Sequence, residues 1–476
     1  MQTPTQSAPP PTTLGGLRAS GHVHKPVKLE LRDNLLAKLA RGEPRFPGIV
    51  GFDDTVLPEL ERALLAGHDV VLLGERGQGK TRLIRSLPSL LDEWTPVVAG
   101  CEINDHPYAP VCASCRARLA ELGDVLPVAW RHRSERYGEK LATPDTSVGD
   151  LVGDVDPIKV AEGRTLGDPE TVHFGLVPRT NRGIFSVNEL PDLAERIQVS
   201  LLNVLEERDI QVRGYQLRLP LDLLLVASAN PEDYTNRGRI ITPLKDRFGA
   251  EIRTHYPLRL DDELALVRQE AELAWGDGPL AQPIVPGHVL EIIARFTRNV
   301  REAPQIDARS GVSARFGIAG AETAAASAVR RAAIAGEATP VVRVVDLPAM
   351  VPTLLGKVEV DQLEEGRELD LLKHLLRRSI AETYRARLGG QDVSGVLRRF
   401  DDGSTVETGE LVPAAELLRR FGPVPGLGQL LRRLGDGDAG ETPGLAAAVL
   451  EFVLEALHLA KRLGKEELPG RAVFGR

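Results

Sequence analysis

The chain has 476 residues, of which 42% are hydrophobic and 26% charged, a composition typical of a globular protein with more than one core. A net charge of -8 without a basic stripe argues against a nucleic-acid-binding protein, and no apolar run approaches the ~20 residues of a membrane span. Residues 1–11 lack the apolar core of a signal peptide, so we expect cytoplasmic residence, and three cysteines are too few for a disulfide framework.

The N-terminal part of the chain leads into a buried strand. Residues 1–27 are rich in proline, threonine, serine and glycine, which favours a disordered tail. Leucines at helical spacing over 28–39 predict a short helix, and 59–65 predicts another. The β-branched and leucine run over 69–73 is then typical of a strand that is buried on both faces.

A glycine-rich segment follows this strand directly and precedes a helical pattern. Strand, loop and helix are the context that a G-x-x-x-x-G-K-[ST] match requires. Glycines let successive backbone N–H groups point at phosphate oxygens, the lysine can reach the β- and γ-phosphates, and the threonine hydroxyl can hold Mg²⁺. The segment therefore predicts an ATP and Mg²⁺ site formed by Gly74, Glu75, Arg76, Gly77, Gln78, Gly79, Lys80 and Thr81.

The next region holds all three cysteines. We predict a second strand over 97–99, followed by an insertion over 100–145. Within the insertion, Cys101, His106, Cys112 and Cys115 have the residue types of a tetrahedral Zn²⁺ site, with His132 as an alternative fourth ligand. Three reduced, half-buried thiols are an equally acceptable interpretation, and a redox pair is a third.

Polar residues end the later strands. The strand over 183–189 ends in Asn188 and Glu189, where an ATPase usually has an aspartate for the Mg²⁺ shell and a glutamate that orients the attacking water. The strand over 223–230 ends in Asn230, which can hydrogen-bond the γ-phosphate and the water. Arg247 follows and is a candidate arginine finger for a neighbouring subunit.

The remaining elements follow from periodicity. We predict a helix over 193–207 and a hairpin over 209–219, and from residue 257 the pattern becomes helical. The strongest helical stretches are 261–273, 285–298, 317–335, 364–388 and 444–463.

Taken in order, six motifs closely resemble those of AAA+ ATPases of the magnesium-chelatase ATPase-subunit and MoxR-type clade. The resemblance covers residues 46–350. The motifs are the segments 46–51, 74–81, 141–145, 182–185, 205–208 and 244–248.

The resemblance implies an α/β fold and further site residues. It implies a P-loop AAA+ core with a parallel five-stranded sheet in the order 5-1-4-3-2, a helical lid and an assembly into a ring, expected to be a hexamer. It places adenine contacts at Ile49 and Val50, sensor 1 at Asn230, the trans arginine at Arg247 and sensor 2 at Arg315, with Arg309 as a weaker candidate. The hairpin would face the pore or the partner.

These considerations divide the chain into a tail over 1–27, an AAA+ domain over 28–256, a lid over 257–356 and an all-α C-terminal region over 357–476. The last region resembles no family we can name and shows no von Willebrand A-type domain. By analogy with the clade, a separate partner protein that carries such a domain is therefore expected.

Two readings of the function compete. The first is an ATP-hydrolysing AAA+ ring motor that remodels or activates a partner protein. The second is a nucleotide-gated assembly scaffold with little turnover, because Asn188 contributes no charge to the metal site. A nucleic-acid motor or transcription activator is disfavoured, since no helix-turn-helix is apparent.

Overall fold

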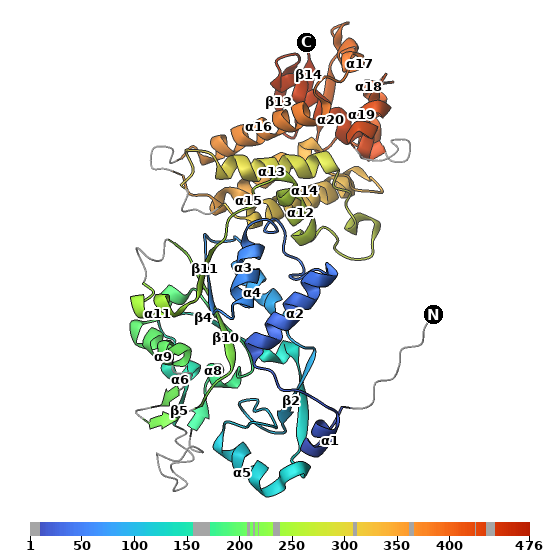
Figure 1. Cartoon of the computed structure of the whole chain (residues 1–476). Helices are drawn as coiled ribbons and strands as arrows, with labels where there is room; N and C mark the ends of the chain where they lie inside the picture. The colour runs from blue at the N-terminus through green and yellow to red at the C-terminus, as the bar shows by residue number, and fades with distance from the viewer. Residues whose placement is uncertain are drawn as a thin grey trace, which may run out of the picture. The chain divides into compact units, whose positions relative to one another are not determined.

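The computed structural model describes residues 10–155, 172–206, 210–212, 215–217, 219–231, 239–307, 312–360, 366–423, 425–434 and 443–476. The chain divides into two compact units, Met1–His255 and Tyr256–Arg476 (Figure 1). Each unit is described by itself below. None of the described helices combines the length and the apolar character that crossing a membrane requires.

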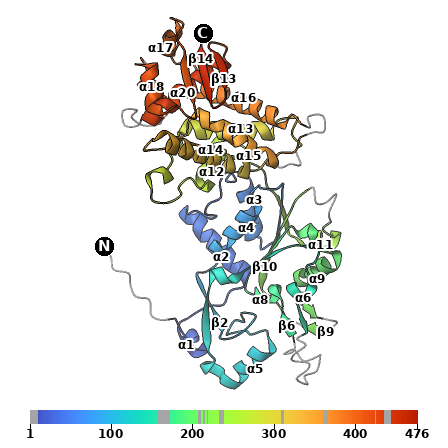
Figure 2. The same ribbon diagram turned by 180° about the vertical axis from the view of Figure 1, so that it is seen from behind.

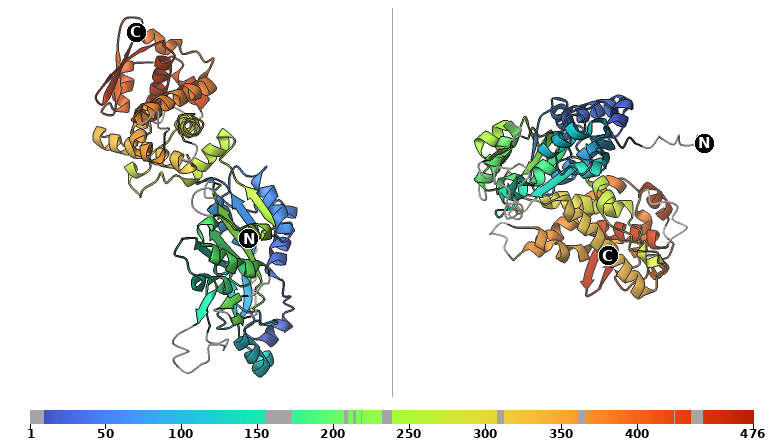
Figure 3. Two further views of the ribbon diagram at one scale, coloured as in Figure 1. Left: turned by 90° about the vertical axis from the view of Figure 1, so that its left-hand side faces the viewer. Right: turned by 90° about the horizontal axis from the view of Figure 1, so that it is seen from below.

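A five-stranded parallel sheet forms the centre of the first unit (Figure 3). Its strands, in spatial order, are β11 (Ala250–Arg253), β1 (Val70–Leu73), β10 (Leu223–Ala229), β7 (Gly183–Asn188) and β4 (Tyr137–Leu141). Numbered along the chain, this is the predicted order 5-1-4-3-2, which confirms the AAA+ topology. Every residue of β1, β7 and β10 is buried, as continuous apolar runs predict for strands covered on both faces.

Helices cover the two faces of this sheet because alternate strand residues point to opposite sides. Val70 and Leu72 belong to one core cluster, together with leucines of three helices. These helices are α2 (Val27–Arg41), α3 (Val56–Leu65) and α4 (Lys80–Ser86) (Figure 2). Val71 and Leu73 belong to a second cluster, which includes α6 (Val148–Leu151), α8 (Leu176–Arg179), α9 (Glu195–Glu206) and α11 (Thr242–Arg247).

The strand predicted over 97–99 forms, but it does not belong to the five-stranded sheet. Residues 94–98 form β2 (Trp94–Val98), which pairs antiparallel with β3 (Val128–His132) in a separate two-stranded sheet. Pro96 lies within β2 and has no N–H to donate, which disfavours a place inside a larger sheet. The second core strand is instead β4, an edge strand inside the predicted insertion, and its sequence YGEKL carries too few apolar residues to be recognised. Along the chain, helix α5 (Ala113–Leu122) connects β2 to β3.

Part of the predicted disordered tail is ordered. Residues 14–19 form helix α1 (Leu14–Ala19), whose first turn is capped by the Thr13 side chain. Leu14 and Leu17 are fully buried, and Leu14 N donates to Leu126 O at 3.0 Å. Residues 10–27 therefore belong to the first unit, while residues 1–9 lie outside the described part of the chain.

Two short antiparallel pairs complete the first unit. Strands β5 (Gly153–Val155) and β6 (Val172–Phe174) pair with each other. Strands β8 (Ile210–Val212) and β9 (Tyr215–Leu217) also pair, which confirms the predicted hairpin.

The second unit is largely helical and has one continuous core. Its helices are α12 (Leu260–Glu270), α13 (Gly287–Arg301), α14 (Ala314–Ala335), α15 (Met350–Leu354), α16 (Glu368–Leu388), α17 (Ser394–Leu397), α18 (Ala414–Phe421), α19 (Leu427–Leu434) and α20 (Pro443–Leu459). A single cluster of buried side chains extends from Leu264 to Phe474, so the expected lid and the expected C-terminal region share it.

The C-terminal region is not all-α. Three antiparallel strands, β12 (Val406–Gly409), β14 (Arg471–Gly475) and β13 (Gly464–Leu468), form a small sheet. The sequence GKEEL of β13 has no alternation of apolar and polar residues, because most of this strand faces solvent. The usual signal of a strand was therefore missing.

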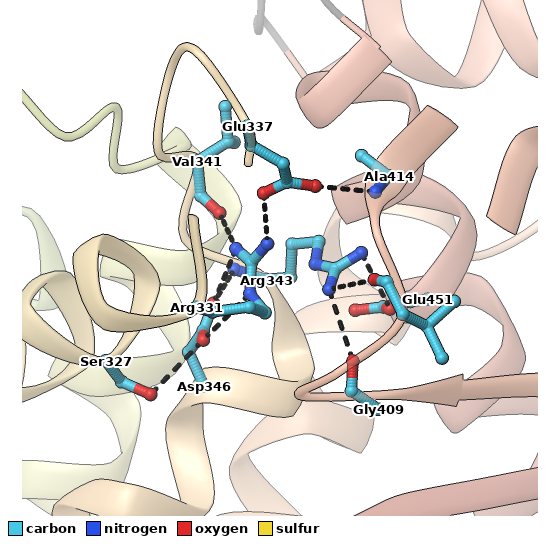
Figure 4. Close-up of polar contacts among 10 residues, drawn as sticks. Ser327, Arg331, Glu337, Val341, Arg343, Asp346, Gly409, Ala414 and Glu451 are labelled. Atoms are coloured by element: carbon cyan, nitrogen blue, oxygen red, sulfur yellow. Dashed lines mark hydrogen bonds and ion pairs between the residues drawn. The ribbon is translucent and has the colours of Figure 1, made fainter. Parts of the chain in front are cut away.

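Buried charges connect the two parts of the second unit (Figure 4). Arg331 on α14 pairs with Asp346 at 3.2 Å, and Arg343 Nη1 lies 3.5 Å from Glu451 Oε1 on α20. Arg343 also donates to Val412 O at 2.9 Å. Burial raises the pKa of Glu451 to about 7, although Arg343 and Arg331 act in the opposite direction. Desolvation therefore outweighs the ion pair at this carboxyl group.

Candidate nucleotide-binding site

The predicted phosphate loop connects β1 to α4, as its sequence requires. Gly77 and Gly79 have φ values of 72° and 74°, in the left-handed region that glycine adopts at low cost. Gly74 is confined by its surroundings, because a Cβ atom there would lie 2.0 Å from Thr254 Oγ1 and 2.3 Å from Gln78 Oε1. The loop therefore needs glycine at all three positions, for a left-handed backbone at two of them and for lack of space at the third.

The loop is held closed by Gln78. Its Oε1 accepts hydrogen bonds from Glu75 N at 3.0 Å and from Thr254 Oγ1 at 2.8 Å. Thr254 follows β11, so the loop is fixed to the edge of the sheet as well as to β1. Successive backbone N–H groups in such a loop form a concave site that can bind phosphate.

Lys80 and Asn230 come together at the carboxyl ends of β1 and β10. The buried Lys80 Nζ donates to Asn230 Oδ1 at 2.8 Å, to Glu75 O at 2.7 Å and to Gly74 O. Thr81, the predicted Mg²⁺ ligand, is the next residue of α4 and is half-buried. The structure therefore brings the lysine of the phosphate loop into direct contact with the residue predicted as sensor 1.

Asn188 at the end of β7 is hydrogen-bonded to a carboxylate on the neighbouring strand. Asn188 Nδ2 donates to Glu139 Oε1 at 2.6 Å, and Asn188 Oδ1 accepts from Ser228 Oγ at 3.2 Å. Glu139 is in turn bound by Arg85 of α4 through two bonds of 2.8 and 2.9 Å. These bonds from Arg85 hold the pKa of Glu139 below its ordinary value, so it is a carboxylate at neutral pH.

Glu139 was missed by the sequence analysis. Its strand was not predicted, and no motif marked the residue. The available signal was Asn188 itself, because an amide where a carboxylate is expected suggests that the negative charge comes from an adjacent residue.

Glu189, the predicted water-orienting residue, has an unusual backbone conformation. Its φ is 58° and its ψ is 47°, a left-handed geometry that costs a non-glycine residue about 1–3 kcal/mol. Glu189 N donates to Ser228 Oγ at 3.2 Å, which stabilises the bend after β7. The side chain is exposed while Asn188 beside it is buried, so the bend directs the Glu189 carboxylate away from the core.

The predicted adenine contacts lie next to α4. Ile49 and Val50 are half-buried, and Ile49 packs against the core cluster that contains α4. Arg82 Nε of α4 donates to Gly48 O at 3.1 Å. The segment that holds Ile49 and Val50 is thus attached to the helix that follows the phosphate loop.

The predicted trans arginine, Arg247, makes its ion pairs with residues outside this cluster, and the predicted sensor 2, Arg315, belongs to the other unit. Arg247 ends α11 and pairs with Glu206 at 2.6 Å and with Asp246 at 3.3 Å. Arg315 lies at the start of α14 in the second unit and is exposed. Arg309 lies outside the described residues.

The cysteine cluster differs from its prediction in one ligand. Side-chain atoms of Cys101, Asp105, Cys112 and Cys115 all lie within 4.8 Å of one another. His106 instead accepts a bond from Tyr108 N at 3.0 Å, and its ring stacks on that of His22.

The alternative ligand also lies elsewhere. His132 Nδ1 is 2.8 Å from Ser134 Oγ, and its ring contacts Trp94. Neither predicted histidine therefore belongs to the cluster. The spacing of residues along the chain does not reveal whether Asp105 or His106 points toward the cysteines.

Comparison with known proteins places these residues in context. The family described as the Sigma-54 interaction domain matches residues 163–247. Magnesium-chelatase subunit ChlI of Nostoc sp. is 29% identical over 233 residues, which cover 48% of this chain and 58% of that protein. The ChlI subunit of Guillardia theta is 31% identical over 191 residues, covering 39% of this chain and 50% of that protein.

A solved structure is also similar in part. It is a cryo-EM-based complex between subunits BchI and BchD of magnesium chelatase, and the matching chain is 23% identical with a TM-score of 0.36. The match covers 67% of this chain and 97% of that chain. By contrast, the chain spans only about half the length of the curated relatives named above.

Proposed function

Because the nucleotide-binding unit is an AAA+ domain related to the magnesium-chelatase ATPase subunits, we propose that this chain hydrolyses ATP as a motor subunit that remodels or activates a partner protein. The observation that carries the proposal is the bond from Lys80 Nζ to Asn230 Oδ1 beside a closed phosphate loop. It joins a phosphate-binding group and a group that can sense the γ-phosphate at one edge of the sheet.

The residues of the site take distinct roles in this proposal. Backbone N–H groups of the loop bind the phosphates, Lys80 neutralises them and Thr81 holds Mg²⁺. Asn230 hydrogen-bonds the γ-phosphate, and Glu189 orients the attacking water. Around the nucleotide, Ile49 and Val50 contact adenine, Arg315 approaches from the lid of the same subunit, and Arg247 approaches from a neighbouring subunit.

Asn188 and Glu139 together replace the usual aspartate of the metal shell. Asn188 contributes a carbonyl oxygen, which can bind a metal-bound water. Glu139 contributes a carboxylate beside Asn188, which Arg85 holds in place through an ion pair with two hydrogen bonds. A carboxylate therefore lies one hydrogen bond away from Asn188, and in our proposal this carboxylate favours turnover over a silent scaffold.

The proposal includes a ring and a partner. In this proposal Arg247, which pairs with Glu206 and Asp246 in its own chain, completes the nucleotide site of another copy. A ring, expected to be a hexamer, supplies such copies. The partner is a separate protein, and one with a von Willebrand A-type domain fits the clade. Cytoplasmic residence remains our prediction.

A phosphate-release assay with MgATP tests the proposal. We expect turnover in the wild type, loss of turnover and of ATP binding in Lys80→Ala, and loss of turnover with retained ATP binding in Glu189→Gln. Glu59→Gln is the matched control, because Glu59 is an exposed glutamate on α3 outside the site. A wild type that binds no ATP, or a Glu189→Gln variant with full turnover, would refute the assignment.

The second candidate function, a nucleotide-gated scaffold, gives a different pattern. It predicts ATP-dependent assembly of the wild type without phosphate release, and turnover only after Asn188→Asp. Sedimentation velocity with and without MgATP, run on the same two proteins, separates assembly from hydrolysis.

A further inference from the structure

Four side chains from the region between β2 and β3 converge on one point, and the proposed ATPase does not use them. They are Cys101, Asp105, Cys112 and Cys115, and one ligand atom from each lies within 4.8 Å of all the others. Ligand atoms around a tetrahedral Zn²⁺ with bonds of about 2.3 Å lie roughly 3.8 Å apart. The cluster therefore needs only small side-chain adjustments to enclose such an ion.

The backbone around the cluster already has the hydrogen bonds of a thiolate site. Asp105 N donates to Cys101 Sγ at 3.3 Å, and Cys115 N donates to Cys112 Sγ at 3.2 Å. Hydrogen bonds to sulfur favour the deprotonated thiolate, which is the form that binds metal. All three cysteines are free of disulfides, with Cys101 and Cys115 buried and Cys112 half-buried.

Asp105 supplies an independent observation. Its side chain is fully buried, and one oxygen, Oδ2, accepts from Cys112 N at 2.9 Å. Within the described part of the chain, the other oxygen, Oδ1, has no hydrogen-bond partner. A buried carboxylate oxygen without a partner is costly, and it lies among three sulfur atoms that would bind the same cation.

Helix α5 buries few of its own side chains. Of its ten residues, Cys115 alone is buried, and Leu119 and Leu122 pack only partly against the core. Such a helix gains little from apolar burial, so a metal that joins its first turn to the loop after β2 would add to the bond from Arg118 to Ala99 O as an attachment.

We propose that Cys101, Cys112, Cys115 and Asp105 bind one structural Zn²⁺ ion that fixes α5 to the loop following β2. Three thiolates with one carboxylate suit Zn²⁺, whereas Mg²⁺ and Ca²⁺ prefer all-oxygen sites. A disulfide between any two of the cysteines would leave the third thiol and the Asp105 oxygen without a function.

Metal analysis of the whole 476-residue chain, purified without chelators, tests the site. We expect about one zinc per chain in the wild type and in His106→Ala and His132→Ala, the controls at the histidines that turn away from the cluster. Asp105→Asn keeps the size of the side chain, and we expect it to lower the affinity for Zn²⁺ at least tenfold in a competition titration with a chromogenic chelator. Cys115→Ser is expected to lose the metal.

Cobalt substitution keeps the test decisive if the cysteine variants do not fold. Co²⁺ bound to the wild type should show thiolate-to-metal charge-transfer bands and the ligand-field bands of a tetrahedral site. Asp105→Asn should shift the ligand-field bands and retain the charge transfer. Zinc-free wild-type protein, a stoichiometric iron–sulfur cluster, loss of zinc in His106→Ala, or an unchanged Asp105→Asn protein would each overturn the assignment. None of these readouts depends on ATP hydrolysis.

Discussion

Replacing Asn188 with aspartate restores the residue that most ATPases carry at the end of this strand, yet we expect it to destabilise the first unit. Asn188 Nδ2 donates to Glu139 Oε1 at 2.6 Å. In Asn188→Asp, an acceptor replaces the donor, and two carboxylates face each other at that separation. The hydrogen bond is lost and a repulsion takes its place.

The size of the effect follows from the distance. Two unit charges 2.6 Å apart repel by about 1.6 kcal/mol in the dielectric of water and by about 6 kcal/mol at an effective dielectric constant of about 20. Proton uptake limits the penalty, because protonating one carboxyl group of pKa about 4 at pH 7 costs roughly 4 kcal/mol. We therefore expect Asn188→Asp to lower the free energy of unfolding of the first unit by about 1.5 to 4 kcal/mol at pH 7. The loss should be smaller at pH 5, where the two carboxyl groups readily share one proton.

Urea unfolding without nucleotide measures this loss. Trp94 and Trp130 lie in the first unit and Trp275 lies in the second, so a Trp275→Phe background restricts the fluorescence signal to the first unit. The matched control is the double variant Glu139→Gln/Asn188→Asp, in which the amide introduced at position 139 can donate to the new carboxylate. This double variant should recover part of the loss.

Two results would refute the reasoning. One is an Asn188→Asp protein as stable as the wild type at pH 7. The other is a double variant whose loss in free energy of unfolding exceeds the sum of the losses of the two single variants. Removing one of two facing charges must relieve repulsion, so the double variant should lose less than that sum.

Three further outcomes are expected. Gly74→Ala should lower ATP affinity at least tenfold and cost about 1–3 kcal/mol, because its Cβ would overlap Thr254 and Gln78; Gly278→Ala, with open space around it, is the control for calorimetric titration. Glu451 has a pKa of about 7 in the fold, above its unfolded value of 4.5, so its contribution to stability is full below pH 4.5 and is lost as pH rises through 7. Glu451→Gln should therefore flatten the dependence of Tm on pH between about pH 4.5 and 7. An unchanged slope would contradict the raised pKa of Glu451. Leu17→Ala should cost about 2–5 kcal/mol in the first unit, because the side chain is fully buried, whereas exposed Val23→Ala should cost little; equal urea midpoints would show that α1 contributes nothing.

The local sequence predicted the parts of the site that depend on neighbouring residues. The order of strand, glycine loop and helix identified Lys80 and Thr81, and the polar ends of two buried strands identified Asn188 and Asn230. These features are visible because the residues to which we assign the chemistry follow directly on strongly apolar runs.

The missed features depend on contacts between distant segments. Glu139 lies on a polar edge strand without apolar periodicity, so neither its strand nor its bond to Asn188 could be predicted. Asp105 and His106 are adjacent, and which of them turns toward the cysteines is decided by packing against His22 and Tyr108. Likewise, Leu14 and Leu17 are too few to indicate a helix within a proline-rich tail.

The shared core of the second unit has a consequence for truncation. A chain ending after residue 356 would lose α16 and α20, and with them the surface that packs against α13 and the carboxylate that faces Arg343. Apolar side chains of α13 would meet water, and a buried guanidinium would lose its counter-charge. Such a fragment should aggregate rather than behave as an isolated lid, so the lid and the C-terminal region are expected to unfold together in one cooperative step.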